Sequence, residues 1–304
     1  MRRKIALLTV AAAMFTTVAQ AQLLYKISGN GLEKPSYIVG TSHMASAQFA
    51  NKIKGISQAI NETDQVYGEV DTDSMVMTTV KRRIERASSL PYGKTLRDVL
   101  TGPQYARVNN TLRELLGAGF ENPEVNSRMG KLTPGALATQ ISTLMYLQAH
   151  MGEFDPMNLI DDYFQKVAKH NGEPVGALET IDFQISLLYT STSMERQIEQ
   201  LMCVINNRNF IVECMEAANE AYHDEDLAGV KAAMDERIGN SCDSTPEEEA
   251  RLIYDRNIAW CAAMPAIMAS KPTLFAVGAG HLPGDKGVLA LLKAAGYTVE
   301  AVTE

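Results

Sequence analysis

Two short segments at opposite ends of the chain repeat one pattern. Residues 35–44 read PSYIVGTSHM and residues 272–282 read PTLFAVGAGHL, so each runs from a proline through an apolar stretch to G-x-x-H. Apolar runs of this length, bounded by proline and glycine, indicate buried β-strands with turns at their ends. If the two strands lie side by side in one sheet, His43 and His281 point into the same space. The pattern therefore predicts a sheet built from both ends of the chain.

The rest of the chain predicts the elements around these two strands. Strands are expected at 23–28, 36–40, 65–70, 174–178, 273–278 and 297–302, and helices at about 47–60, 73–88, 102–117, 133–150, 157–170 and 285–295, with further helices between 183 and 269. The helices are indicated by apolar residues spaced three and four apart. We therefore predict an α/β fold with a mixed β-sheet core built from N- and C-terminal segments. Residues 22–304 would form a single domain with a large central helical insertion at about 73–270.

The first 21 residues have the features of a secretory signal peptide. Basic residues at 2–4 precede an apolar stretch at 5–18, and Ala19-Gln20-Ala21 has the small-x-small pattern of a cleavage site. The alternative is an uncleaved anchor, but a membrane span needs roughly 20 apolar residues. We expect cleavage after Ala21, a periplasmic or secreted protein, and no membrane span in the mature chain.

The charge of the mature chain excludes one class of partner. Removing the signal takes away three cations and no acid, which leaves 25 basic and 36 acidic side chains and a formal charge of −11. Nucleic-acid phosphates would be repelled by such a surface, and no basic cluster compensates for it. We therefore expect no nucleic-acid partner.

The cysteines also indicate export. Four are present, at 203, 214, 242 and 261, and an even number in an exported chain is typical of disulfides. Four cysteines allow three pairings. Cys203–Cys242 is favoured because Cys242 lies in a polar loop that can reach a neighbouring helix. Free buried thiols are the alternative, and the spacing does not match a compact zinc motif.

Three further residues could act with the two histidines. Glu69 and Glu179 each follow a short apolar strand, where a carboxylate can ligate a metal or act as a general base. Arg256 lies on a long helix and could hold Glu69 or a substrate carboxylate. Each residue also has a structural explanation. The histidines could be ordinary turn residues, the acids could face water or begin a helix, and the arginine could be solvated.

Several well-known catalytic motifs are absent from the sequence. It contains no G-x-S-x-G, no H-E-x-x-H and no G-x-x-x-x-G-K-[ST], which argues against an ordinary serine hydrolase, a helical zinc site and a phosphate-binding loop. GAGHLPG lacks the order of a dinucleotide-binding turn.

At these residues the chain resembles the TraB/GumN family. The similarity covers essentially the whole mature chain, through YIVGTSHM, GEVD, GALETIDFQ, the RN-x-x-W of residues 256–260 and the closing VGAGHLPGDKGVLALLKAAGYTV. The family's Tiki proteins are membrane-tethered metalloproteases that cleave Wnt ligands and use a divalent metal such as manganese or cobalt. The resemblance implies His43, Glu69 and His281 as metal ligands, with Glu179 and Arg256 as supporting pocket residues. Because we expect no membrane tether, we do not expect a Wnt-like substrate.

The hypothesis from the sequence is an exported metal-dependent hydrolase acting on a peptide or small-molecule substrate. A divalent manganese, cobalt or zinc ion would be its cofactor, and Glu69, Glu179 and Arg256 would take part in catalysis. Two alternatives remain open. One is a non-catalytic protein that binds a metal, haem or small ligand, and the other is a metal-free, esterase-like hydrolase that uses the two histidines as acid and base.

Overall fold

The computed structural model describes residues 22–91, 93–150 and 158–303. Its centre is a six-stranded mixed sheet in the order β4-β3-β5-β2-β1-β6. The strands are β1 Leu24–Ser28, β2 Ser36–Thr41, β3 Gln65–Gly68, β4 Val175–Ala177, β5 Thr273–Gly278 and β6 Thr298–Ala301. Strands β4, β3, β5 and β2 run parallel, while β1 is antiparallel to its two neighbours. The α/β fold predicted from the sequence is confirmed.

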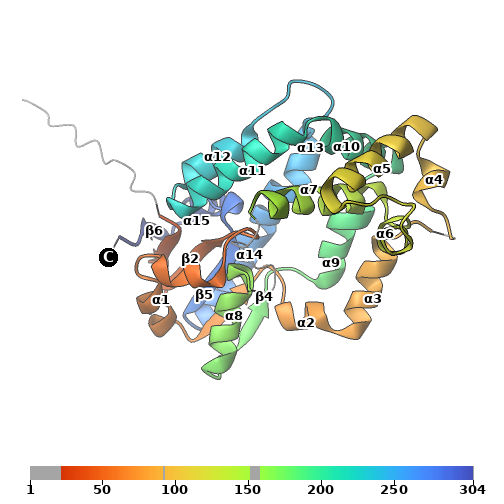
Figure 1. The fold of residues 1–304 in the computed structure, drawn as a ribbon. Helices are drawn as coiled ribbons and strands as arrows, with labels where there is room; N and C mark the ends of the chain where they lie inside the picture. The colour runs from red at the N-terminus through yellow and green to blue at the C-terminus, as the bar shows by residue number, and fades with distance from the viewer. Residues whose placement is uncertain (1–21, 92, 151–157, 304) are drawn as a thin grey trace, which may run out of the picture.

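The first and last parts of the chain meet in this sheet. Strand β2 pairs directly with β5, with Val39 opposite Ala276 and Thr41 opposite Gly278. Figure 1 shows the strands of both chain ends together at one end of the molecule. The adjacency expected from the repeated G-x-x-H pattern is therefore present.

Helices make up most of the remaining chain (Figure 1). They are η1 Ala47–Lys52, α1 Ile56–Glu62, α2 Thr72–Val76, α3 Thr78–Ala87, α4 Leu96–Val99, α5 Gly102–Leu116, α6 Pro123–Met129, α7 Pro134–Ala149, α8 Ile160–His170, α9 Ile181–Ile185, η2 Ser186–Thr190, α10 Met194–Asn206, α11 Arg208–His223, α12 Leu227–Asp235, α13 Pro246–Glu249, η3 Ala250–Tyr254, α14 Asp255–Ser270, η4 Ala279–His281 and α15 Val288–Ala294. Helices α4 and α6 were not expected from the sequence.

Two of the expected helices are broken. The one at 47–60 becomes η1 and α1, because Gly55 adopts a left-handed φ of 72° before α1 begins. The one at 73–88 becomes α2 and α3, because Met77 between them is extended. The spacing of apolar residues continues through both breaks, so helical periodicity alone could not locate them.

Helices α8 and α14 cover opposite faces of the sheet. Thr41 at the end of β2 donates to Asp161 of α8, and Gln165 of α8 lies against Gly68 of β3. Gln65 points to the other face, where its amide donates to the carbonyl of Ile267 in α14. Neighbouring residues of a strand point to opposite faces, which is why β3 contacts both layers.

The buried apolar residues form two clusters. The larger one surrounds the sheet and includes Trp260 and Phe164. The second lies among α4, α5, α7 and α10 and includes Leu112, Leu137, Ile141 and Leu201. These four helices thus share a core that is separate from the core of the sheet.

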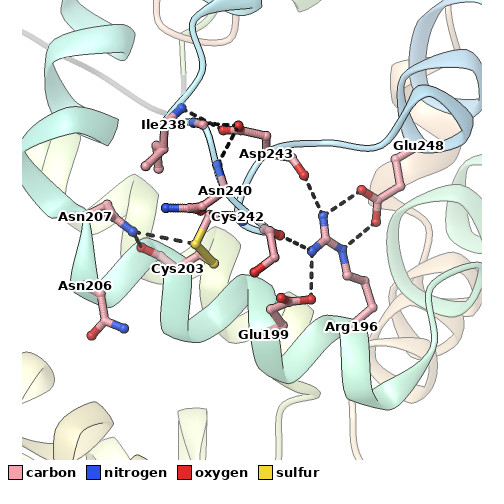
Figure 2. The surroundings of a disulfide bond; sticks show 12 residues. Arg196, Glu199, Cys203, Asn206, Asn207, Ile238, Asn240, Cys242, Asp243 and Glu248 are labelled. Carbon is pink, nitrogen blue, oxygen red and sulfur yellow. Dashed lines mark hydrogen bonds and ion pairs between the residues drawn. A yellow bond between two sulfur atoms is a disulfide. The ribbon is translucent and has the colours of Figure 1, made fainter.

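A disulfide joins Cys203 of α10 to Cys242 in the loop between α12 and α13, which is the pairing favoured from the sequence. Figure 2 shows Arg196 beside it, bonded to Glu248, Glu199 and carbonyls of the same loop. Cys214 and Cys261 are free thiols.

No helix among the described residues is both long and apolar enough to cross a bilayer. The expected signal peptide, 1–21, and its cleavage site lie outside the described residues.

Candidate functional site

Four neighbouring parallel strands end at the same edge of the sheet, and a candidate residue follows each. His43 follows β2, Glu69 follows β3, Glu179 follows β4 and His281 follows β5. The backbones of the two acids stay paired beyond their strands, because the N–H of Glu179 donates to the carbonyl of Glu69 at 2.9 Å. Ligands bind at this edge in open α/β sheets. The topology therefore gathers side chains that are far apart in sequence.

Arg256 joins the two acids. Its guanidinium donates from Nε to Oε1 of Glu179 at 2.6 Å and from Nη2 to Oε2 of Glu69 at 2.5 Å. The indole of Trp260, one turn further along α14, donates to the same Oε1 of Glu179 at 2.8 Å. Arg256 is only 6% exposed. One cation thus lies between the buried carboxylate of Glu179 and the partly exposed carboxylate of Glu69, and the group carries a net negative charge.

Glu69 is held in its ionised form. Burial opposes ionisation, but the charge of Arg256 and the backbone N–H of Gly278, which donates to Oε1 at 2.8 Å, hold the pKa of Glu69 below its usual value. A side chain on residue 278 would crowd this contact, because a Cβ there would lie 3.2 Å from Oε1.

His281 is buried and fixed on both ring nitrogens. Arg256 donates from Nη1 to Nε2 at 2.9 Å, so Nδ1 carries the proton and donates to Oδ1 of Asn257 at 2.7 Å. The amide nitrogen of Asn257 donates to the carbonyl of Lys286 at 2.9 Å, which orients its oxygen toward the ring. Burial, together with the charge of Arg256, lowers the pKa of His281 to about 4. The imidazole is therefore neutral.

His43 has a different environment. Its Nδ1 lies 3.0 Å from Oδ2 of Asp161, whose other oxygen accepts from the hydroxyl of Thr41 at 2.7 Å. The hydrogen bond and the negative charge of Asp161 raise the pKa of His43 to about 9. The side chain is 83% exposed, and its Nε2 points away from Asp161.

Two hollows meet at these residues. One, of about 360 Å³, is lined by His43, Glu69, Arg256 and His281. The other, of about 340 Å³, shares the first three and lies on the side of α8 and α9. Glu179 lines neither, because it is buried behind Arg256. A cavity of about 410 Å³ between α5, α7 and α11 contains none of the candidate residues.

Sequence reasoning missed three polar residues here. Asp161 holds His43, and Thr41 donates to Asp161. Gln184 of α9 donates to Glu179 at 3.0 Å and to Glu69 at 3.4 Å. Asp161 stands in the first turn of α8, where an acid is usual for the helix dipole, so its type and position carried no signal.

The nitrogen and oxygen atoms of the site are of the kinds that bind a divalent metal, but the side chains are not grouped around one point. Within the described ranges, no three His, Cys, Asp or Glu side chains are grouped so that they could hold an ion as they stand. Both histidines are nevertheless fixed through Nδ1 by a side-chain oxygen, which is how metal-binding imidazoles are oriented. Nε2 of His43 has no hydrogen-bond partner among the described residues, but the raised pKa of the ring keeps a proton on it near neutral pH, which a metal would have to displace. Arg256 takes Nε2 of His281. An ion bound by both rings requires Arg256 to release that nitrogen.

One known protein family matches the chain over most of its length. The model of the TraB/PrgY/gumN family matches residues 23–301. The chain belongs to this family. The matched range contains every candidate residue, and it confirms the family resemblance seen in the sequence.

Two curated relatives are metalloproteases by name. The chain is 24% identical to Metalloprotease TIKI1 of Danio rerio, over 88% of this chain and 61% of that protein. It is 23% identical to Metalloprotease TIKI homolog of Nematostella vectensis, over 88% of this chain and 65% of that protein. The chain thus spans somewhat over three fifths of these relatives' length.

Proposed function

We propose that this protein is an exported metal-dependent hydrolase that cleaves peptide bonds. The observation that carries the proposal is the convergence of His43, Glu69 and His281 at one carboxyl edge of the sheet, with both imidazoles fixed through Nδ1. The metalloprotease names of the relatives support the reaction class. The Cys203–Cys242 disulfide supports export, because disulfides persist in oxidising compartments.

His43, His281 and Glu69 would hold the ion, which we propose to be manganese, cobalt or zinc. When bound, such an ion supplies a Lewis acid that polarises a carbonyl and lowers the pKa of a water molecule. Asp161 and Asn257 fix the two imidazoles through Nδ1, so that Nε2 of each ring would be the nitrogen that holds the ion. Arg256 would leave Nε2 of His281 while keeping its contacts with the two glutamates.

The other residues have distinct proposed roles. Glu69 lines both hollows and is the carboxylate best placed to accept a proton from water. Arg256 can donate to an oxygen of the substrate from the nitrogen that it withdraws from His281. Glu179 lies outside the hollows and positions Arg256, so its effect on catalysis would be indirect.

The metal site is tested by elemental analysis of purified mature protein. We expect His43→Ala and His281→Ala each to lose bound manganese, cobalt or zinc while the circular dichroism spectrum is unchanged. His170→Ala is the matched control, because His170 is an exposed histidine at the end of α8. If the double variant H43A/H281A binds as much of each metal as the wild type, the metal-site proposal is wrong.

A second candidate is a metal-free hydrolase. It is favoured by the contact of Arg256 with Nε2 of His281, and by the Asp161–His43 pair, which resembles the base and orienting acid of hydrolases without a metal. Cleavage of peptide and ester libraries with and without a chelator separates the two candidates. Chelator-sensitive peptide cleavage supports the first, and chelator-resistant turnover supports the second. No turnover with any metal would favour a non-catalytic binding protein.

A further inference from the structure

The hollow beside His281 has two chemically different walls. His43, Glu69, Arg256 and His281 form one wall together with Asp161, and this wall contains the charged groups of the hollow. The second wall comes from the loop after β2 and from α11, α12 and η3. It consists mainly of Met44, Tyr222, Val230, Met234, Leu252 and Ile253, with Asn219 as its polar side chain. No charged side chain belongs to this second wall, and the hydroxyl of Tyr222 donates to the carbonyl of Gly40 at 3.0 Å. We call it the apolar wall.

Two residues of the apolar wall are exposed. Met234 and Leu252 are each 46% accessible, although both are large and hydrophobic. They come from different elements, α12 and η3, and border the same hollow. Exposed apolar residues that line the same concave site are typical of a surface that binds an apolar ligand group.

Met234 lies directly against the turn that carries His281. A Cβ at Gly280 would stand 2.4 Å from the sulfur of Met234 and 2.7 Å from its methyl carbon. Glycine at 280 therefore makes the space into which Met234 packs. This places a flexible thioether one residue from His281, at the boundary between the charged and the apolar walls.

The apolar surface continues beyond this hollow. A further cavity of about 370 Å³ shares Met44, Ala218 and Met234 with it and is lined also by Phe210 and Met215. The polar residues of that cavity, among them Glu236 and Arg237, come from the segment after α12. A chain bound at the site would thus pass along Met234 in one direction. In the other direction it would reach the hollow lined by Gln165, Gln184 and Leu187.

We infer that Met234 determines the specificity of this site, and that the apolar wall receives a large apolar side chain of a peptide substrate next to the bond that is cut. The inference rests on the proposed peptidase function. Leucine, methionine and phenylalanine side chains would be preferred.

The physical reason is the difference between the two walls. A buried apolar side chain gains about 25 cal/mol for each Å² removed from water. A charged side chain at the same place would lose its hydration without finding a partner. Methionine has an unbranched, flexible side chain that adapts to different apolar shapes, so the preference should be for size and apolarity rather than for one amino acid.

Binding and cleavage are measured separately. Fluorescein-labelled short Gly/Ser peptides with one central guest residue (Leu, Met, Phe, Ser, Asp or Lys) are titrated with metal-free protein, and anisotropy is recorded. We expect the wild type to bind the Leu, Met and Phe peptides about tenfold or more tightly than the Asp peptide. Met234→Glu should lose about tenfold in affinity for the apolar peptides. Met77→Glu is the matched control, since Met77 is also an exposed methionine (55%) and lines none of the four cavities above.

The outcomes separate this inference from the proposed function. Equal binding of all guests, no binding of any peptide, or a Met234→Glu variant that matches the wild type overturns the inference. Apolar preference without chelator-sensitive cleavage keeps the inference of an apolar peptide subsite and removes the peptidase. Chelator-sensitive cleavage without any preference among the guest residues keeps the peptidase and removes the inference of an apolar subsite. Circular dichroism and thermal unfolding check that both variants are folded.

Discussion

Arg256 donates a hydrogen bond to Nε2 of His281 across 2.9 Å, although both side chains are basic and buried. A guanidinium has no lone pair to offer, so the imidazole must be neutral and must accept at Nε2. The proton of His281 is then on Nδ1, where Asn257 accepts it at 2.7 Å. This contact keeps a lone pair on the nitrogen that the proposed metal would use.

The first prediction concerns this tautomer. In metal-free protein at neutral pH, long-range ¹H–¹⁵N correlation spectra should show His281 as a neutral ring protonated on Nδ1. Assignment is made with His281→Asn. A ring protonated on Nε2 would mean that Arg256 and His281 are not bonded in solution.

The second prediction concerns the buried ion-pair network. Arg256→Gln should destabilise the protein by about 3–5 kcal/mol, because it leaves the buried carboxylate of Glu179 and the partly buried one of Glu69 without a cation. The double variant with Glu179→Gln should recover part of the lost free energy of unfolding, because the unpaired charge of Glu179 is then removed. Urea unfolding of the metal-free protein measures both. The control is Arg128→Gln, which removes an exposed pair with Glu124 and should cost less than about 1 kcal/mol. Equal effects of the two arginine variants would contradict a buried role for Arg256.

The third prediction concerns the disulfide. Cys203 and Cys242 are 39 residues apart. Closing a loop of that length lowers the conformational entropy of the unfolded chain and raises its free energy by about 4 kcal/mol. Cys203→Ser should therefore lower the free energy of unfolding by roughly that amount, and dithiothreitol should destabilise the wild type similarly. The loop that carries Cys242 is also held by Arg196 and Asp243 (Figure 2), so native-state contacts should survive reduction. Cys214→Ser is the control, and it should leave the effect of dithiothreitol intact.

The sequence predicted the edge of the sheet at which the site lies. Strands β2 and β5 could be recognised because an apolar run bounded by proline and glycine has few other interpretations. Their adjacency followed from the matching frames of His43 and His281. Glu69 and Glu179 were found by the same reasoning, since each comes directly after a strand of the parallel sheet.

The contacts around those residues could not be predicted. Asp161 reaches His43 from α8. The two residues are far apart in sequence and share no helix or strand whose periodicity would reveal the pair. Arg256 was a candidate, but its bond to His281 depends on how α14 packs against the sheet. Likewise, no sequence pattern indicated that Glu179 lies behind Arg256 while Glu69 lines the hollows. Such details arise from tertiary packing, which a single sequence does not encode in local spacing.

The fourth prediction concerns Cys261, a free thiol on α14 that burial protects by raising its pKa to about 12. At pH 8 such a thiol has about a thousandth of the thiolate of an ordinary cysteine. The greater nucleophilicity of a basic thiolate recovers part of this, so alkylation by iodoacetamide should be about 50-fold slower than in urea-unfolded protein. Mass spectrometry of timed digests gives the rate for this site.

Because the folded pKa lies above the unfolded value, Cys261 contributes stability that is present below about pH 9 and is lost as the pH rises toward 12. Cys261→Ala should remove that part of the alkaline loss, and equal alkaline stability curves for the variant and the wild type would contradict the raised pKa.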